Sequence, residues 1–242
     1  MQLIKIVLLA LLTSPCIAQF NDSTHYYFRY VTTGVVNKTD DGNSYVLNNG
    51  LTFNINKKKV TINSNASWVY GVQNNDLTNN DFSAVADVDY LKNTQKLYYW
   101  GLVGYDNSFS LKINHRLQMG AGIGYTFVNT KTLNFVLSDG FLFETADLID
   151  NKLGHDVYNT VRNTLRIKYK WEIKDLLVFD GSDFVQPSIT SINDYVLRFT
   201  NNFSIKLKEW LRLTASLNYN KVNRTDHENL LLTFGATIEK YF

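Results

Sequence analysis

The sequence predicts an all-β fold in which twelve antiparallel strands close into a transmembrane β-barrel. Three observations lead to this prediction: apolar and polar residues alternate along the chain, the alternating segments are long, and an export signal precedes them. Of the 242 residues, 14% are aromatic and only 19% are charged, which excludes a coiled coil and a disordered chain. The formal net charge is +2 and no basic block is present, so a nucleic-acid partner is not expected.

Residues 1–18 have the order of a secretory signal peptide. Lys5 supplies the positive charge, a short apolar run follows, and Ala18 is the small residue at the expected cleavage point. The apolar run is far shorter than the ~20 residues that a membrane-spanning helix needs. We therefore expect a cleaved signal at 1–18 and one barrel at 19–242. Cys16, the single cysteine, lies in the signal and fits a lipoprotein signal poorly, so no disulfide is expected.

The clearest alternation runs from Leu211 to Tyr219, where odd-numbered residues are apolar or aromatic and even-numbered residues are polar. Successive side chains of a strand point to opposite faces, so this segment is predicted to be a strand with one apolar face. The same pattern predicts eleven further strands. The twelve segments are residues 26–36, 45–55, 60–70, 82–90, 97–106, 115–127, 133–144, 157–171, 176–186, 195–207, 211–219 and 230–242.

The length of these segments indicates a membrane. They have 9–15 residues, whereas strands of globular sheets most often have ~5–6 and a tilted strand crosses a bilayer with ~9–11. Hydrocarbon offers no partner for a free strand edge, so the first strand must pair with the last. The alternative is a soluble sandwich or lipocalin-like barrel, which would place its apolar face inside. Strand length, the export signal and the chain terminus favour the membrane.

The connections are predicted to differ between the two ends of the barrel. One end has tight Asn- and Lys-rich turns, and the other has longer loops, such as residues 71–80 and 146–156. Outer-membrane barrels have short periplasmic turns and longer outer loops. An even number of strands places both termini at the same end, which predicts periplasmic termini.

The last strand ends in Phe242. It resembles the terminal strand of Gram-negative outer-membrane proteins, although Lys240 departs from that pattern. This resemblance implies that Phe242 is a membrane-insertion signal, that the barrel-assembly machinery and outer-membrane lipid are partners, and that the protein lies in the Gram-negative outer membrane. In its signal, length, Asn/Lys turns, Tyr-rich strands and terminal Phe, the whole chain resembles the salt-induced outer-membrane protein family, a domain family of unknown function. That implies a barrel without assigned chemistry.

If the apolar face meets lipid, a set of charged residues must face the lumen. One interpretation is a transverse electric field across a narrow pore, and the other is that the charges pair and plug the interior. For a pore, Arg162→Ala and Arg166→Ala are expected to weaken anion preference. The predicted lumen-facing residues are Arg116, Arg162, Arg166, Lys168, Arg198, Arg212, Asp87, Asp89, Asp106 and Glu144.

The sequence carries no recognisable catalytic motif. Outer-membrane phospholipases place a Ser two residues after a His, but the residue two after His115 is Leu117. No metal-ligand spacing, glycine-rich phosphate loop or cysteine nucleophile is present. We therefore expect no enzyme activity, no cofactor and no metal. The predicted function is a small passive pore or stress-related envelope protein for small polar or anionic solutes. The alternative is a non-conducting structural or adhesive barrel, with an outer-membrane hydrolase third.

Overall fold

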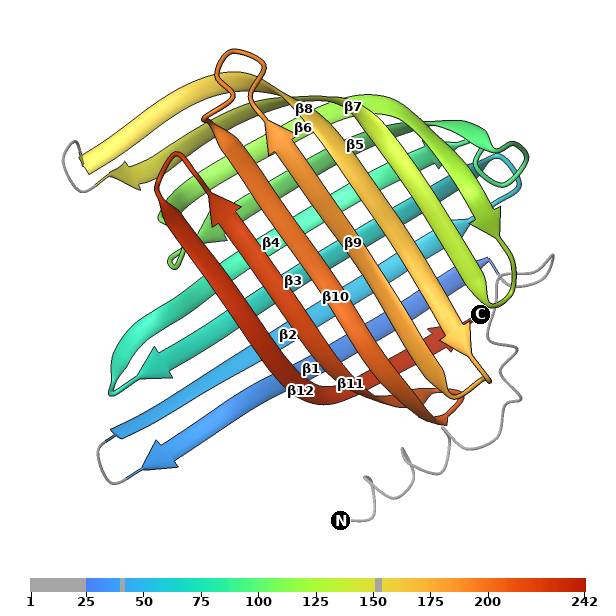
Figure 1. Ribbon diagram of the computed structural model, residues 1–242, viewed down its shortest axis with the longest axis horizontal. Coiled ribbons are helices and arrows are strands. Elements are labelled where there is room, and N and C mark those ends of the chain that lie inside the picture. The colour runs from blue at the N-terminus through green and yellow to red at the C-terminus, as the bar shows by residue number, and fades with distance from the viewer. Residues whose placement is uncertain (1–24, 40–41, 151–153) are drawn as a thin grey trace.

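Long strands account for almost all of the structure. The computed structural model describes residues 25–39, 42–150 and 154–242, so the predicted signal peptide lies outside the described residues (Figure 1). Every predicted strand is present, which confirms the all-β fold. The strands are β1 (Tyr26–Thr39), β2 (Gly42–Asn56), β3 (Val60–Gln73), β4 (Asp76–Tyr90), β5 (Leu97–Ser108), β6 (Ile113–Asn129), β7 (Leu133–Asp150), β8 (Gly154–Ile173), β9 (Leu177–Pro187), β10 (Tyr195–Lys208), β11 (Leu211–Val222) and β12 (His227–Tyr241).

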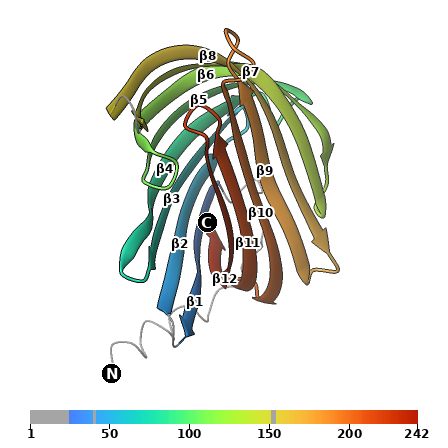
Figure 2. The same ribbon diagram turned by 60° about the vertical axis from the view of Figure 1, so that its left-hand side comes forward.

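The sheet is closed. Each strand pairs antiparallel with its neighbours in sequence, and β1 pairs with β12 from Tyr27–Tyr241 to Gly34–Phe234. Closure gives every strand a partner on both sides, as a lipid environment requires. Some strand ends at the opposite end of the barrel extend beyond one partner, namely residues 35–39 of β1 and 154–160 of β8. Figure 1 shows β9–β12 crossing in front of β1–β4 with the opposite inclination, and Figure 2 shows these two groups as opposite walls. Tilted strands of a barrel have this appearance.

The outer surface is apolar and the interior is polar. On β11, Leu213 and Leu217 are 52% and 38% exposed, whereas Arg212, Thr214 and Ser216 are buried. A water-soluble barrel has the reverse distribution. The soluble alternative is therefore wrong, and the fold is that of a transmembrane barrel.

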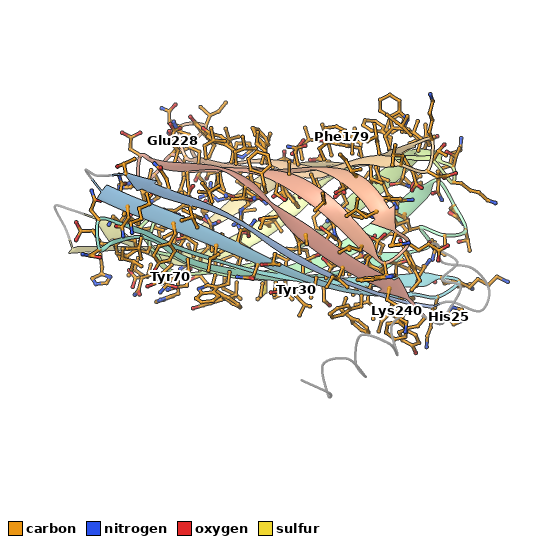
Figure 3. The ribbon with its side chains drawn as sticks, turned by 90° about the horizontal axis from the view of Figure 1, so that it is seen from below. His25, Tyr30, Tyr70, Phe179, Glu228 and Lys240 are labelled. Carbon is orange, nitrogen blue, oxygen red and sulfur yellow. The ribbon has the colours of Figure 1, made fainter. Side chains whose placement is uncertain are left out.

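Aromatic side chains project from the outer surface on both walls. Figure 3 shows Tyr30 and Tyr70 on one side of the barrel and Phe179 on the other. Among residues 25–39, 42–150 and 154–242, no helix is long and apolar enough to cross a membrane.

The predicted difference in connection length is wrong. We call the end where β1 begins and β12 ends the terminal end; its connections have two to six residues, and those of the opposite end have two to seven. The strands continue through the segments expected to be loops, because a two-residue turn suffices to join them. Asn74 and Asn75 both have positive φ (50° and 70°), as the two central residues of a type I′ hairpin turn do.

Candidate functional site in the barrel lumen

The structure places the ten charged side chains singled out in the sequence inside the barrel. Lys168 and Arg198 are partly open to a central cavity. The other eight are buried: Arg116, Arg162, Arg166, Arg212, Asp87, Asp89, Asp106 and Glu144.

One carboxylate is shared by two guanidinium groups. Asp106 on β5 lies 3.1 Å from Arg116 Nη2 on β6 and 2.6 Å from Arg198 Nη2 on β10. Because β5 and β10 are not neighbours, the Arg198 contact spans the lumen. Two positive charges facing one negative charge leave a positive surplus. The buried Nη1 of Arg116 has no hydrogen-bond partner among the described residues.

A second carboxylate is shared in the same way. Asp87 on β4 lies 3.3 Å from Arg166 Nη1 and 3.5 Å from Lys168 Nζ, both on β8, and accepts a hydrogen bond from Asn63 (2.6 Å). The guanidinium of Arg166 also lies 5.6 Å from the ring centroid of Trp100, a favourable cation–π distance. The contacts of Asp87 with Arg166 and Lys168 also span the lumen, and two cations beside one carboxylate leave a second unbalanced positive charge.

Arg162 belongs to a different group of charges. Its Nη2 lies 2.7 Å from Glu144 and 2.8 Å from Asp194, and the hydroxyl of Tyr158 donates to Glu144 (2.7 Å). The Arg162 side chain is fully buried and does not line the cavity. Its role is therefore to hold β7, β8 and the β9–β10 connection together.

The remaining predicted charges form balanced pairs. Asp89 lies 2.7 Å from Lys92, and Arg212 pairs with Glu239. Sequence reasoning missed a further pair that spans the lumen, Arg29 on β1 with Asp180 on β9 (3.2 Å).

Part of the lumen is filled by a small apolar cluster of Tyr98, Trp100, Val136 and Leu142. A Cβ atom at Gly122 or at Gly140 would lie 2.6 Å from the Trp100 ring. A larger residue at either position would clash with the indole, so the two glycines make room for Trp100 against β6 and β7. The cluster narrows the lumen beside β5, β6 and β7.

The unfilled part of the lumen is a cavity of about 600 Å³. Its lining contains many amide side chains, including Asn48, Asn63, Asn65, Asn202, Asn218 and Asn229. Lys170 also lines it and makes no ion pair with a described residue. The charged lining residues are the basic Arg29, Lys92, Arg116, Lys168, Lys170, Arg198 and Lys221 and the acidic Asp81, Asp106 and Asp180, seven against three. Three of these basic residues, Lys92, Lys168 and Lys221, pair with carboxylates behind the lining, Asp89, Asp87 and Glu228. The wall therefore has a positive excess that is smaller than the count of lining residues indicates.

Contacts between connections narrow the lumen at the opposite end. The hydroxyl of Thr225, in the β11–β12 turn, donates to the carbonyl of Leu111 in the β5–β6 connection (3.2 Å). Arg224 lies 2.6 Å from Asp156 and 3.2 Å from Asp194. Its hydrogen bond with Asp156 raises the pKa of Arg224 above its usual value.

His115 faces the outer surface near the opposite end. Its Nδ1 lies 4.0 Å from Asp147, and His155 Nδ1 lies 2.8 Å from the same carboxylate. The hydrogen bond from Asn114 (2.7 Å), with a contribution from His155, lowers the pKa of Asp147. Within the described part of the chain, no hydroxyl or thiol group completes a catalytic triad with these histidines. Nor do three His, Cys, Asp or Glu residues there form a group that could hold a metal ion.

The fold and the charged lumen together define a membrane-spanning β-barrel of the outer-membrane type. Residues 31–237 match the family described as DUF481, a protein family of unknown function, and the chain belongs to this family. No protein with a curated description matches the chain.

Three solved outer-membrane barrels are similar to this chain. The translocator domain of the autotransporter NalP from Neisseria meningitidis has 12% identity and a TM-score of 0.51, covering 98% of this chain and 93% of that one. The NanC porin has 11% identity and a TM-score of 0.51, covering 90% and 99%. An outer-membrane channel from Pseudomonas putida F1 has 8% identity and a TM-score of 0.50, covering 95% and 100%. At such identities the likeness establishes the fold.

Proposed function

We propose that the protein is a passive channel for small polar solutes in the Gram-negative outer membrane, with a preference for anions. The observation that carries this proposal is the cavity lining, in which seven basic side chains face three acidic ones. A fixed positive excess along a narrow water-filled path attracts anions and repels cations. The porin and channel folds of the similar structures agree with this role.

Two carboxylates, each shared by two cations, explain how the excess of positive charge is stabilised among buried side chains. Asp106 and Asp87 each hold two cations in place, so that desolvation of those cations is partly offset and one charge per cluster remains. The amide side chains of the cavity lining can donate to an anion and accept from a hydroxyl group. Solutes would therefore pass by exchanging hydrogen bonds along the wall.

The proposal includes a location and a route of assembly. Export by the predicted signal at residues 1–18, recognition of Phe242 by the barrel-assembly machinery and termini on the periplasmic side are all consistent with a closed barrel. Phe242 is half exposed, and its backbone exchanges two hydrogen bonds with Tyr26, 2.8 and 2.9 Å. A stress-related role, as in the salt-induced outer-membrane proteins that the sequence resembles, is part of the same proposal.

The second candidate is a non-conducting structural or adhesive barrel. It is favoured by the Tyr98–Trp100 cluster and by the ion pairs that cross the lumen, because both fill space that a solute would need. The third candidate, a hydrolase, would require lipid or peptide turnover that is lost in His115→Ala.

Planar-bilayer recording of the refolded protein separates the first two candidates. We expect discrete conductance steps, and in a salt gradient a reversal potential of the sign that anion permeation produces. Absence of steps at every voltage and salt concentration, from protein shown to be folded by its heat-dependent mobility in gels, would rule out the channel and favour the structural barrel.

A further inference from the structure

Two groups of polar side chains lie on the outer, lipid-facing surface between β7 and β10. In the first group, Asn201 on β10 donates to Asp183 on β9 (3.2 Å) and accepts a hydrogen bond from the Tyr169 hydroxyl on β8. In the second group, Asn163 on β8 donates to Asp139 on β7 (2.9 Å). Both carboxyl groups are on the same wall of the barrel.

Both groups are surrounded by exposed apolar side chains. Across the ladders, Asp139 is paired with Ile123 and Leu165, and Asp183 with Ile167 and Phe199. Ile123 and Leu165 are exposed, as are Phe179 and Val185 on the face of β9 that carries Asp183. The polar groups therefore lie within the apolar belt, where an ionisable group facing hydrocarbon is costly and marks a functional contact.

The backbone is shaped to admit the first group. Gly181 lies beneath the Tyr169 ring and the Asn201 amide, and a Cβ atom there would be 2.5 Å from Tyr169 Cζ and 2.6 Å from Asn201 Oδ1. The Tyr169 ring also packs on Phe179, with centroids 5.2 Å apart, and Figure 3 shows Phe179 on the outer surface. The cluster is thus held in place by packing and by a glycine.

Each group retains hydrogen-bonding capacity. An Asn amide has two N–H donors and a carboxylate has two acceptor oxygens. One N–H of Asn201 and one oxygen of Asp139 have no hydrogen-bond partner among the described residues. Acyl chains supply neither donors nor acceptors, so a partner within the belt must bring polar side chains of its own.

We propose that this face, the outer surface of β7–β10, pairs with the same face of a second copy of the chain in the membrane. In a twofold contact, Asn201 donates to Asp139 of the partner subunit, and the reverse contact forms by symmetry. The surface is self-complementary because the free donor and the free acceptor lie three strands apart on one wall.

The twofold axis then passes between Ile167 and Asp183, which are direct partners in the β8–β9 ladder. Asp183 lies close to its counterpart across the axis, an arrangement in which two carboxyl groups hold one shared proton. Four strands about 4.8 Å apart and a belt about 25 Å tall present roughly 500 Å² per copy. The total of about 1,000 Å² lies at the lower limit for a biological interface.

Disulfide trapping tests the proposal. Ile167→Cys is placed near the axis in a chain that also carries Cys16→Ser, and the protein is oxidised in phospholipid vesicles at low protein-to-lipid ratio. We expect a disulfide-linked dimer from Ile167→Cys and only monomer from the matched control Leu51→Cys, which is exposed on the opposite wall. Monomer from both variants, or equal dimer from both, would overturn the proposal.

Second-site substitutions test the polar contacts themselves. Adding Asn201→Leu to Ile167→Cys should lower the dimer yield at least about fivefold, because two symmetry-related hydrogen bonds are lost. Asn49→Leu, which removes an outward amide on β2, should leave the yield unchanged, and Asp183→Asn should preserve it. Heat-dependent gel mobility confirms folding of each variant. An undiminished yield in Asn201→Leu would contradict the assigned contact, whatever the outcome of the conductance experiments.

Discussion

Replacing Arg198 with Gln is the most direct test of how the lumen selects ions. The side chain is 17% exposed and shares Asp106 with Arg116, so its removal leaves a balanced ion pair and eliminates the surplus charge of that cluster. A unit charge about 7 Å from the ion path contributes about 0.6 kcal/mol at an effective dielectric constant of ~80, and about 1.2 kcal/mol at ~40. The charge stabilises an anion and destabilises a cation by this amount, and screening at about 0.1 M salt reduces each effect by roughly half. The ratio of anion to cation permeability should therefore fall by about three- to eightfold.

The measurement is the reversal potential of single channels in a KCl gradient at low ionic strength. At about 0.1 M salt the Debye length is ~10 Å, so the charge still acts across the lumen. Lys174→Gln, in the β8–β9 turn, removes an equal charge outside the lumen and serves as the control. A reversal potential unchanged in folded Arg198→Gln would refute the assignment of the field to this cluster. An equal change in Lys174→Gln would attribute selectivity to overall charge.

Three further predictions concern the filled part of the lumen and the opposite end. Trp100→Ala should raise single-channel conductance and destabilise the barrel by about 3–5 kcal/mol in urea unfolding; unchanged conductance would show that the indole does not narrow the path. Gly122→Ala places a Cβ atom 2.6 Å from the Trp100 ring and against the β7 backbone, so folded protein on gels should be strongly reduced, and wild-type stability would contradict this packing. Asp147 has a lowered pKa, because Asn114 donates to it and His155 contacts it, so its carboxylate stabilises the fold above the usual Asp pKa of ~3.9 and less as pH falls. The unfolding midpoints of wild type and Asp147→Asn should differ at neutral pH and converge below about pH 3; a constant difference would exclude this contribution.

The strands and the inward charges could be predicted because both depend only on residue parity. Arg212 alternates with Leu211 and Leu213, and that pattern alone decides which side chain faces inward once the apolar face is assigned to lipid. Continuation of β3 and β4 to the Asn74–Asn75 turn could also have been predicted, since Asn tolerates positive φ.

The pairing of charges could not be predicted in the same way. Whether Arg198 contacts Asp106 across the lumen depends on strand tilt and barrel closure, which bring β5 and β10 together. For the same reason the sequence could not distinguish Arg162, which is enclosed by Glu144 and Asp194, from Arg198, which lines the cavity. The loss of anion preference predicted from the sequence for a substitution of Arg162 is therefore expected for a substitution of Arg198 instead.

The outward carboxyl of Asp183 was missed because β9 has apolar residues on both faces. Val178 and Phe184 point into the barrel, while Phe179 and Val185 point outward. Alternation is therefore weak in this strand, and the parity of its polar residues carries little information.

The pairing of β1 with β12 has a consequence for how the barrel forms. Eight residue pairs join these strands, compared with fourteen between β1 and β2. Each hairpin requires only a short loop to close, but this seam joins residues at least 200 positions apart and carries the largest chain-entropy cost of any ladder. The β1–β12 ladder, which has the largest entropy cost, therefore forms last, when the whole chain is in place. Mechanical or chemical unfolding should begin by separating β1 from β12.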